Sequence, residues 1–163
     1  MIDASALPDR DTRFAMAQQG FEHLTQSGYK AIGFDHFALP HDPMAQATRT
    51  GALRRNFQGF TDDPSDTLIG MGASAISGFA GLIAQNEKNA GRYRMVAGRG
   101  QLTADHGIAR SKEDQLRGRL IEELLCHGRT TLTPCLLARV EDRLRPFVSR
   151  GLAVRSGLDL TIT

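Results

Sequence analysis

The sequence predicts an α/β fold in its first part and a mainly helical fold in its second part. Up to residue 90, apolar patterns follow the order helix, strand, helix, strand, which is the order of a parallel α/β unit. Residues 91–163 favour helices followed by a hairpin, the order of a winged-helix-like module. Because two strands do not form a stable sheet alone, the first part is expected to complete a larger sheet.

The first three elements follow from apolar spacing and from capping residues. Apolar side chains at intervals of three and four predict a helix over 10–27, which ends before Gly28. The apolar run YKAIGFDHF predicts one buried strand. Asp42 is placed to cap the next helix, with Pro43 at its first position and Gly51 at its end.

The rest of the first part gives fewer signals. The segment RNFQGF has no alternating apolar pattern, so it is assigned neither to a strand nor to a helix face. TLIGMG predicts a second strand. Asn86 is placed to cap a helix that runs through Tyr93 and Val96.

Two helices are predicted in the second part. Ser111 and Asp114 form a capping box, and leucines every four residues continue that helix to Cys126. A further helix starts at Thr133 and is expected to be interrupted at Pro146.

The C-terminal segment LAVRSGLDLTIT predicts a hairpin. Its residues alternate between apolar and polar, and Ser156 and Gly157 are placed as the turn. The alternation continues to the last residue, so the chain is expected to be truncated at this end.

Composition indicates a globular protein and excludes several classes. Hydrophobic residues make up 40% and charged residues 23%, which is typical of a folded domain, and the net charge of +2 argues against nucleic acid as the main partner. No stretch has the length of a membrane span. The start, MIDASALPDRD, lacks the basic region and apolar core of a signal peptide, so a cytoplasmic location is expected.

No metal site is predicted. Cys126 and Cys135 are not spaced as a metal knuckle or as a redox pair. His36, His41 and Asp42 lie close together in the sequence, but they lack the fixed spacing that a closed metal site needs.

Two positions in the first part are candidates for a ligand site. Asp35 and His36 follow the predicted first strand, where α/β barrels place functional groups, so they are expected at a pocket mouth; the alternative is a structural role for His36. Gly70 and Gly72 in GMGASA fit the spacing of a dinucleotide turn. A broader interpretation is that these glycines keep a strand end open for a ligand.

The segment RNFQGF is a third candidate. Asn56 and Gln58 offer amide groups, Phe57 and Phe60 offer ring faces, and Gly59 leaves room for a turn. The alternative is a structural loop whose amides cap its own backbone. A DNA-binding surface is also suggested by the arginines within 139–150, although acidic residues among them favour a solvated, salt-bridged face.

Several motifs together resemble a known family. DHFA-P-D, L-RNFQG and IGMGASAIS occur in order and at specific spacings, and the likeness continues through RG-LTADHGIARSKEDQLR. In these motifs the sequence is similar to the oxygen-independent coproporphyrinogen III oxidases, which are radical S-adenosylmethionine (radical SAM) enzymes of haem biosynthesis. The likeness covers nearly the whole chain.

The resemblance implies a fold, a reaction and cofactors. The implied fold is the C-terminal part of an incomplete (β/α) TIM-like barrel over 1–90, followed by a helical, winged-helix-like domain over 91–163. The implied reaction is the oxidative decarboxylation of two propionates of coproporphyrinogen III to the vinyl groups of protoporphyrinogen IX. The implied cofactors are S-adenosylmethionine and, in the complete enzyme, a [4Fe-4S] cluster.

The resemblance also implies site residues. Phe57, Gln58 and Ile76 fall at positions that contact a second S-adenosylmethionine molecule, and Asn56, Gly70 and Gly72 are assigned more weakly to the same region. Phe60 stands where the family usually has tyrosine.

The cluster motif of the family, CxxxCxxC, does not occur in the sequence, nor do the residues that hold the first S-adenosylmethionine. Since three thiolates are needed to hold a cluster, no catalytic residue is assigned, and the isolated chain is expected to be inactive, as an expressed piece or a truncated gene product. Its expected partners are a missing N-terminal barrel part, coproporphyrinogen III and S-adenosylmethionine. The competing hypotheses are a haem- or porphyrin-binding module without catalysis and a winged-helix DNA-binding protein.

Overall fold

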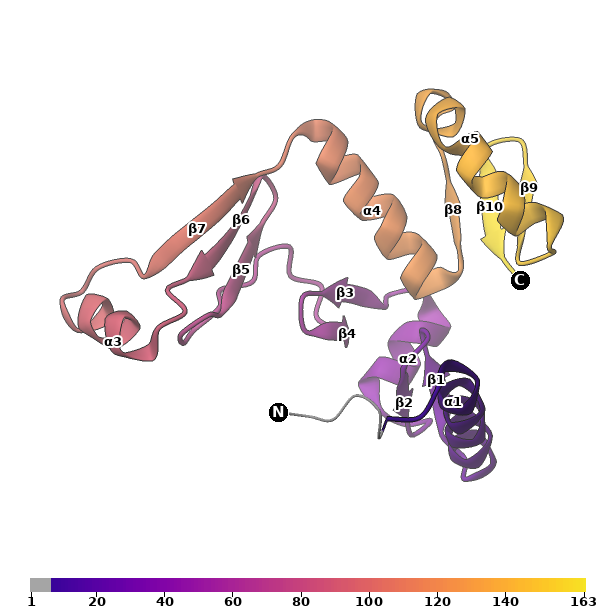
Figure 1. The fold of residues 1–163 in the computed structure, drawn as a ribbon, viewed down its shortest axis with the longest axis horizontal. Helices are drawn as coiled ribbons and strands as arrows, with labels where there is room; N and C mark the ends of the chain where they lie inside the picture. Colours follow the sequence, from indigo (N-terminus) through magenta and orange to yellow (C-terminus); the bar gives the residue numbers. More distant parts are fainter. Residues whose placement is uncertain (1–6) are drawn as a thin grey trace.

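The chain folds into small antiparallel sheets that are connected by helices (Figure 1). The computed structural model describes residues 7–163; residues 1–6, part of the start that lacks a signal-peptide pattern, lie outside the described residues. No helix within residues 7–163 is long and apolar enough to cross a membrane.

The N-terminal elements are two helices around a short hairpin. Asp9 caps the first helix, and its side chain accepts a hydrogen bond from the backbone N–H of Thr12. Asp42 and Gly51 cap the two ends of the second helix, as predicted. These elements are α1 (Arg10–Gln26), β1 (Lys30–Ile32), β2 (His36–Ala38) and α2 (Pro43–Thr50).

The expectation of one strand over YKAIGFDHF is wrong. Gly33 has a φ of 59°, in the left-handed region, so the chain reverses there and β1 pairs with β2 in antiparallel register. All paired strands among residues 7–163 are antiparallel, so the predicted parallel α/β unit does not form within them. Whether these residues complete a barrel sheet stays a prediction.

The middle of the chain forms a hairpin and a three-stranded sheet. RNFQGF, which was not assigned, contains the hairpin of β3 (Arg54–Asn56) and β4 (Gly59–Thr61). The sheet is formed by β5 (Ile76–Phe79), β6 (Leu82–Asn86) and β7 (Ala104–Ala109), in the order β5-β6-β7.

Two expectations in this region are wrong. TLIGMG is not a strand; its Leu68 makes only an isolated antiparallel bridge with Gly78. The helix α3 (Ala90–Gly98) is capped by Asn89, while Asn86 is buried at the end of β6. Because β7 pairs with β6, the sheet continues across the predicted division at residue 90.

The C-terminal elements are two helices and three strands. Ser111 and Asp114 form the predicted capping box, but Pro146 does not interrupt its helix. A proline removes one backbone donor, and here it does so in the last turn, where few bonds follow. The elements are α4 (Lys112–His127), β8 (Arg129–Thr131), α5 (Pro134–Ser149), β9 (Ala153–Ser156) and β10 (Asp159–Ile162).

The C-terminal hairpin is confirmed, with a shifted turn. Ser156 pairs with Asp159, so Gly157 and Leu158 form the loop, and β10 lies between β8 and β9. A winged-helix assignment for this helix-and-hairpin arrangement stays a prediction.

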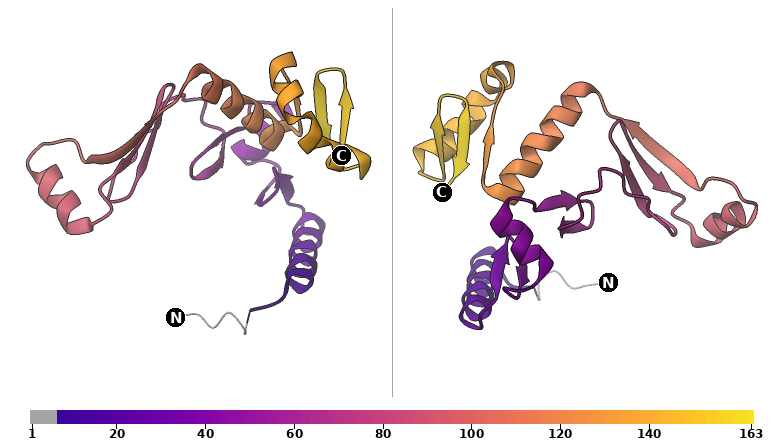
Figure 2. Two further views of the ribbon diagram at one scale, coloured as in Figure 1. Left: turned by 45° about the horizontal axis from the view of Figure 1, so that its top comes forward. Right: turned by 180° about the vertical axis from the view of Figure 1, so that it is seen from behind.

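Two separate cores are joined by α4. One core contains Ile32, Leu53, Phe60 and Cys126, and the other contains Leu120, Leu132, Ala153 and Leu160. Figure 1 shows α4 between the β5–β7 sheet on one side and α5 with β8–β10 on the other, and Figure 2 shows the same order from behind. Because α4 packs against both cores, its position determines which of its side chains lie next to the β3–β4 hairpin.

Candidate functional site

The RNFQGF segment is a tight hairpin with its own internal cap. Asn56 pairs with Gly59, so Phe57 and Gln58 form a two-residue turn. The backbone N–H of Gln58 donates to Asn56 Oδ1 at 2.8 Å, which is the self-capping arrangement considered as the alternative to a ligand site. Asn56 is thus a structural residue of the turn, while Phe57 and Gln58 are exposed at its tip.

Phe57 and Ile76 are brought to one region of the molecule. The Phe57 ring lies over β5, where a Cβ built on Gly78 would be 3.8 Å from Phe57 Cε2. Ile76 lies two residues before Gly78 and therefore on the same face of that strand. The side chain of Gln58 is exposed, and no hydrogen bond joins it to the described residues. Two of the three main predicted cofactor residues thus share one surface, next to a free amide.

Gly70 and Gly72 have a structural explanation. The Gly70 N–H donates to Ser77 Oγ and the Gly72 N–H donates to the Tyr93 hydroxyl, each at 3.0 Å. Asn86 Nδ2 donates to both glycine carbonyl oxygens. A Cβ on Gly70 would lie 2.6 Å from the Ile76 carbonyl oxygen. These N–H groups are therefore used within the protein, and glycine is needed for close approach to β5.

Asp35 and His36 lie at the β1–β2 turn. His36 Nδ1 and Asp35 Oδ1 are 2.7 Å apart, and the imidazole packs edge-on against Phe60 with ring centroids 5.3 Å apart. A Cβ on Gly59 would be 2.8 Å from His36 Nε2. The pair therefore helps to pack the two hairpins together, and neither residue lines the cavity described next.

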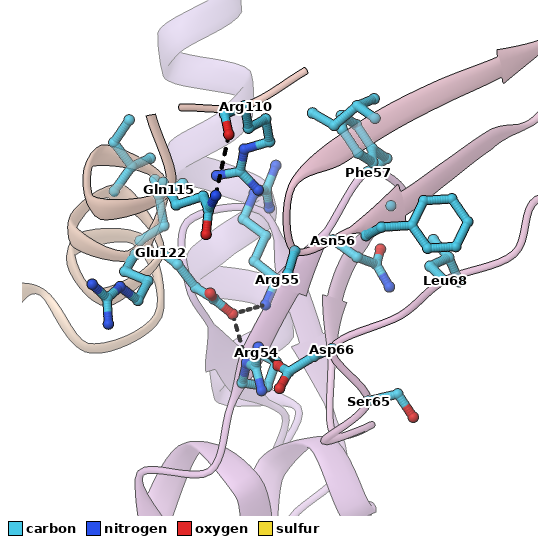
Figure 3. A pocket seen from close by; sticks show the side chains of 18 of the residues that line it. Arg54, Arg55, Asn56, Phe57, Ser65, Asp66, Leu68, Arg110, Gln115 and Glu122 are labelled. Atoms are coloured by element: carbon cyan, nitrogen blue, oxygen red, sulfur yellow. Dashed lines mark hydrogen bonds and ion pairs between the residues drawn. The ribbon is translucent and has the colours of Figure 1, made fainter. Parts of the chain in front are cut away.

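A cavity of about 820 Å³ lies between the β3–β4 hairpin, the β5–β6 hairpin and one face of α4 (Figure 3). We call it the basic cavity. Its lining includes Asn56 and Phe57 but neither Gln58 nor Ile76. The basic lining residues are Arg54, Arg55, Arg110, Lys112 and Arg119, and the large apolar ones are Phe57, Leu68, Phe79, Ile83, Ile121 and Leu125.

Glu122 clamps the hairpin to α4. Its Oε1 accepts from Arg54 Nε at 2.8 Å and from the backbone N–H of Arg55 at 3.1 Å. Arg54 also donates to Asp66 Oδ1 at 3.0 Å. The hydrogen bond with Glu122, and then that with Asp66, raise the pKa of the Arg54 guanidinium above its ordinary value. Sequence reasoning missed Glu122 because its partners are 67 and 68 residues away.

Arg55 packs against two aromatic rings. Its guanidinium carbon is 5.2 Å from the centroid of Phe34 and 4.7 Å from that of Phe60. These distances are those of cation–π contacts. Phe60, at the position where the family usually has tyrosine, is buried, so its ring serves the core and this contact rather than an open pocket wall.

The described residues do not fit an iron–sulfur cluster. Cys126 is buried and Cys135 is exposed, and no three His, Cys, Asp or Glu side chains within residues 7–163 are grouped to hold a metal ion. Burial, and secondarily the Glu122 charge, raise the pKa of the Cys126 thiol to about 11. Because a cluster ligand must be a thiolate, Cys126 is unsuited to that role.

The fold matches a solved structure over almost all of its length. A coproporphyrinogen III oxidase from Escherichia coli, described as a radical SAM enzyme, aligns with a TM-score of 0.89 and 35% identity, covering 99% of this chain and 40% of that one. The fold of this chain is therefore similar to part of a radical SAM enzyme. No family model matches the chain.

Curated proteins that are similar to this chain carry a more specific name. An oxygen-independent coproporphyrinogen III oxidase from Cereibacter sphaeroides is 41% identical over 92% of this chain and 33% of its own length. One from Paracoccus denitrificans is 44% identical over 77% of this chain and 28% of its own length. The chain is thus homologous to the oxygen-independent coproporphyrinogen III oxidases, and it spans about a third of the length of these relatives.

Proposed function

We propose that this chain forms part of an oxygen-independent coproporphyrinogen III oxidase, which converts two propionates of coproporphyrinogen III to the vinyl groups of protoporphyrinogen IX. The observation that carries the proposal is the RNFQGF hairpin, which presents Phe57 at the basic cavity in a chain homologous to these oxidases. The proposal includes a barrel-derived part over 1–90 and a helical, winged-helix-like part over 91–163, of which β7 continues the sheet of the first part.

In this proposal the chain contributes binding and orientation. The complete enzyme's [4Fe-4S] cluster and S-adenosylmethionine supply the radical chemistry when bound. Because residues 7–163 do not fit a cluster, the chain is proposed to be inactive alone and to work with the cluster-binding part of the enzyme as its partner.

The proposed site for S-adenosylmethionine is the surface around Phe57, Gln58 and Ile76. An exposed ring can stack on a nucleoside, and a free amide can both donate to and accept from the edge of its base. Ile76, on β5, lies on the same face of the strand as Gly78, which the Phe57 ring approaches, and it offers apolar contact. Asn56, Gly70 and Gly72 support this surface by holding the turn and the main chain beside it.

Substitution of Gln58→Ala in the complete enzyme tests the role of this surface. We expect loss of turnover with an unchanged cluster spectrum, because the variant removes a ligand contact that does not support the fold. Turnover and the visible absorbance of the cluster are the measurements. Gln18→Ala, at an exposed position of α1, is the matched control and should keep full turnover. Full turnover of the Gln58 variant would refute the assigned role.

A second candidate function is porphyrin binding without catalysis. The basic and apolar lining of the cavity favours it, because such a lining suits an apolar ligand that bears carboxylates. Turnover by the complete protein that contains this chain separates the two functions. Conversion of coproporphyrinogen III supports the oxidase, whereas porphyrin binding without conversion supports the binding module.

A further inference from the structure

The basic cavity has an uncompensated positive charge. Its lining contains five basic side chains and two carboxylates, those of Asp66 and Glu122. Both carboxylates pair with Arg54, at 3.0 and 2.8 Å. Within residues 7–163, no carboxylate forms an ion pair with the remaining basic lining residues, Arg55, Arg110, Lys112 and Arg119.

Arg55 contributes an unused hydrogen-bond donor to this region. Its Nη1 is buried and has no hydrogen-bond partner among the described residues. A buried donor left without an acceptor destabilises the folded protein. The rings of Phe34 and Phe60 hold the guanidinium in place without using its N–H groups. The Arg55 guanidinium, which lines the cavity, is therefore already positioned before a ligand binds.

Arg110 is held in the wall of the cavity by α4. Its Nη2 donates to the Asp114 carbonyl oxygen at 3.2 Å, and its backbone carbonyl accepts from Gln115 Nε2 at 3.1 Å. A Cβ built on Gly118 would be only 2.3 Å from Arg110 Nη2. The absence of a side chain at Gly118 therefore makes the space in which the guanidinium lies.

Arg55 and Arg110 both line the cavity. Figure 3 shows the side chain of Arg55, from the hairpin, and that of Arg110, from the segment before α4, pointing toward one another. The apolar side chains of Phe57, Leu68 and Phe79 line the cavity as well. A ligand that fits this lining has an apolar body and at least one carboxylate.

We propose that Arg55 and Arg110 together bind a carboxylate of an apolar polycarboxylate ligand in the basic cavity. On the proposed function, on which the identity of the ligand rests, this carboxylate belongs to a propionate side chain of the tetrapyrrole substrate. Charged hydrogen bonds from two arginines then fix the orientation of the substrate relative to the Phe57 surface.

Binding of two carboxylate probes to the chain tests the proposal. The probes are coproporphyrin III, measured by its fluorescence, and dodecanedioate, an apolar dicarboxylate without a tetrapyrrole ring, measured by calorimetry. We expect Arg110→Gln to weaken binding about ten-fold, the size expected for loss of one charged hydrogen bond. Arg143→Gln, at an exposed position of α5 outside the cavity, is the control and should leave affinity unchanged.

Gly118→Ala separates the binding role from a structural one. Alanine favours a helix over glycine, so thermal stability should be kept or raised. The new methyl group displaces the flexible end of Arg110, so affinity should fall as it does in Arg110→Gln.

Each outcome decides the proposal. Affinities of both variants within two-fold of the unsubstituted chain would overturn it, and so would failure of the unsubstituted chain to bind either probe; neither result bears on turnover of the complete enzyme. Variant-sensitive binding of dodecanedioate without binding of coproporphyrin III would support the carboxylate site and reject the tetrapyrrole as its ligand. Variant-sensitive binding of coproporphyrin III would support both the carboxylate site and the tetrapyrrole as its ligand.

Discussion

Gly33 and Gly51 both have left-handed backbone conformations, but only Gly33 faces a ring. A Cβ on Gly33 would lie 2.0 Å from Phe60 Cζ, whereas nothing lies within 4 Å of one on Gly51. Gly33→Ala should therefore lower the free energy of unfolding by about 2–5 kcal/mol, through overpacking and backbone strain together. Gly51→Ala carries only the strain and should cost about 1–2 kcal/mol. Urea unfolding of both variants measures the difference, and equal losses would contradict the packing argument.

Single residues of the site were predictable only where a local motif marks them. Phe57 and Gln58 were found because they belong to the RNFQG motif, and the structure places them at an exposed turn. Arg110 and Glu122 were missed because nothing local marks them; Glu122 meets its partner Arg54 across 68 residues. A long-range ion pair is visible only after the chain has folded.

At the scale of elements, Glu122 holds β3 against α4. Glu122→Ala removes the acceptor for Arg54 Nε and for the Arg55 backbone N–H, so it should lower the free energy of unfolding by about 1.5–3 kcal/mol. The control is Glu141→Ala, which breaks only a surface pair with Arg155 and should cost less than about 1 kcal/mol. Chemical denaturation gives both values. A cost for Glu122→Ala no larger than that of the control would show that the clamp is not needed.

Helices were predicted better than strands, for a physical reason. Caps such as Asp9, Asp42 and Ser111 are local signals, and the structure uses all three. The strands of the β1–β2 and β3–β4 hairpins are three residues long, too short to show an alternating pattern. Their pairing depends on turns at Gly33 and at Phe57 with Gln58, which an apolar run does not reveal.

At the scale of the whole molecule, we expect the chain alone to form no iron–sulfur cluster. It contains two cysteines, of which Cys126 is buried with its thiol pKa raised to about 11, whereas three thiolates are needed. Reconstitution with iron and sulfide, followed by visible absorbance, tests this. A complete relative that carries CxxxCxxC is the control and should develop cluster absorbance under the same conditions. A stable cluster spectrum from the chain alone would contradict the expectation.

The overall arrangement was predictable through resemblance more than through pattern. Apolar periodicity predicted a parallel unit, but all strand pairs within residues 7–163 are antiparallel. The apolar stripe of α1 illustrates the cause: it forms the predicted helix, yet Phe14 is 72% exposed. Periodicity shows which side chains share a face, but it does not show what covers that face.

Because α4 packs against both cores, the segments before and after it are constrained to evolve together. Cys126 belongs to one core and Leu120 to the other, so different faces of a single helix pack against different neighbours. Recombination between related genes within or beside α4 would bring together a helix and a core that had not evolved in contact. The segments before and after this helix are therefore expected to be exchanged together and to diverge at matched rates.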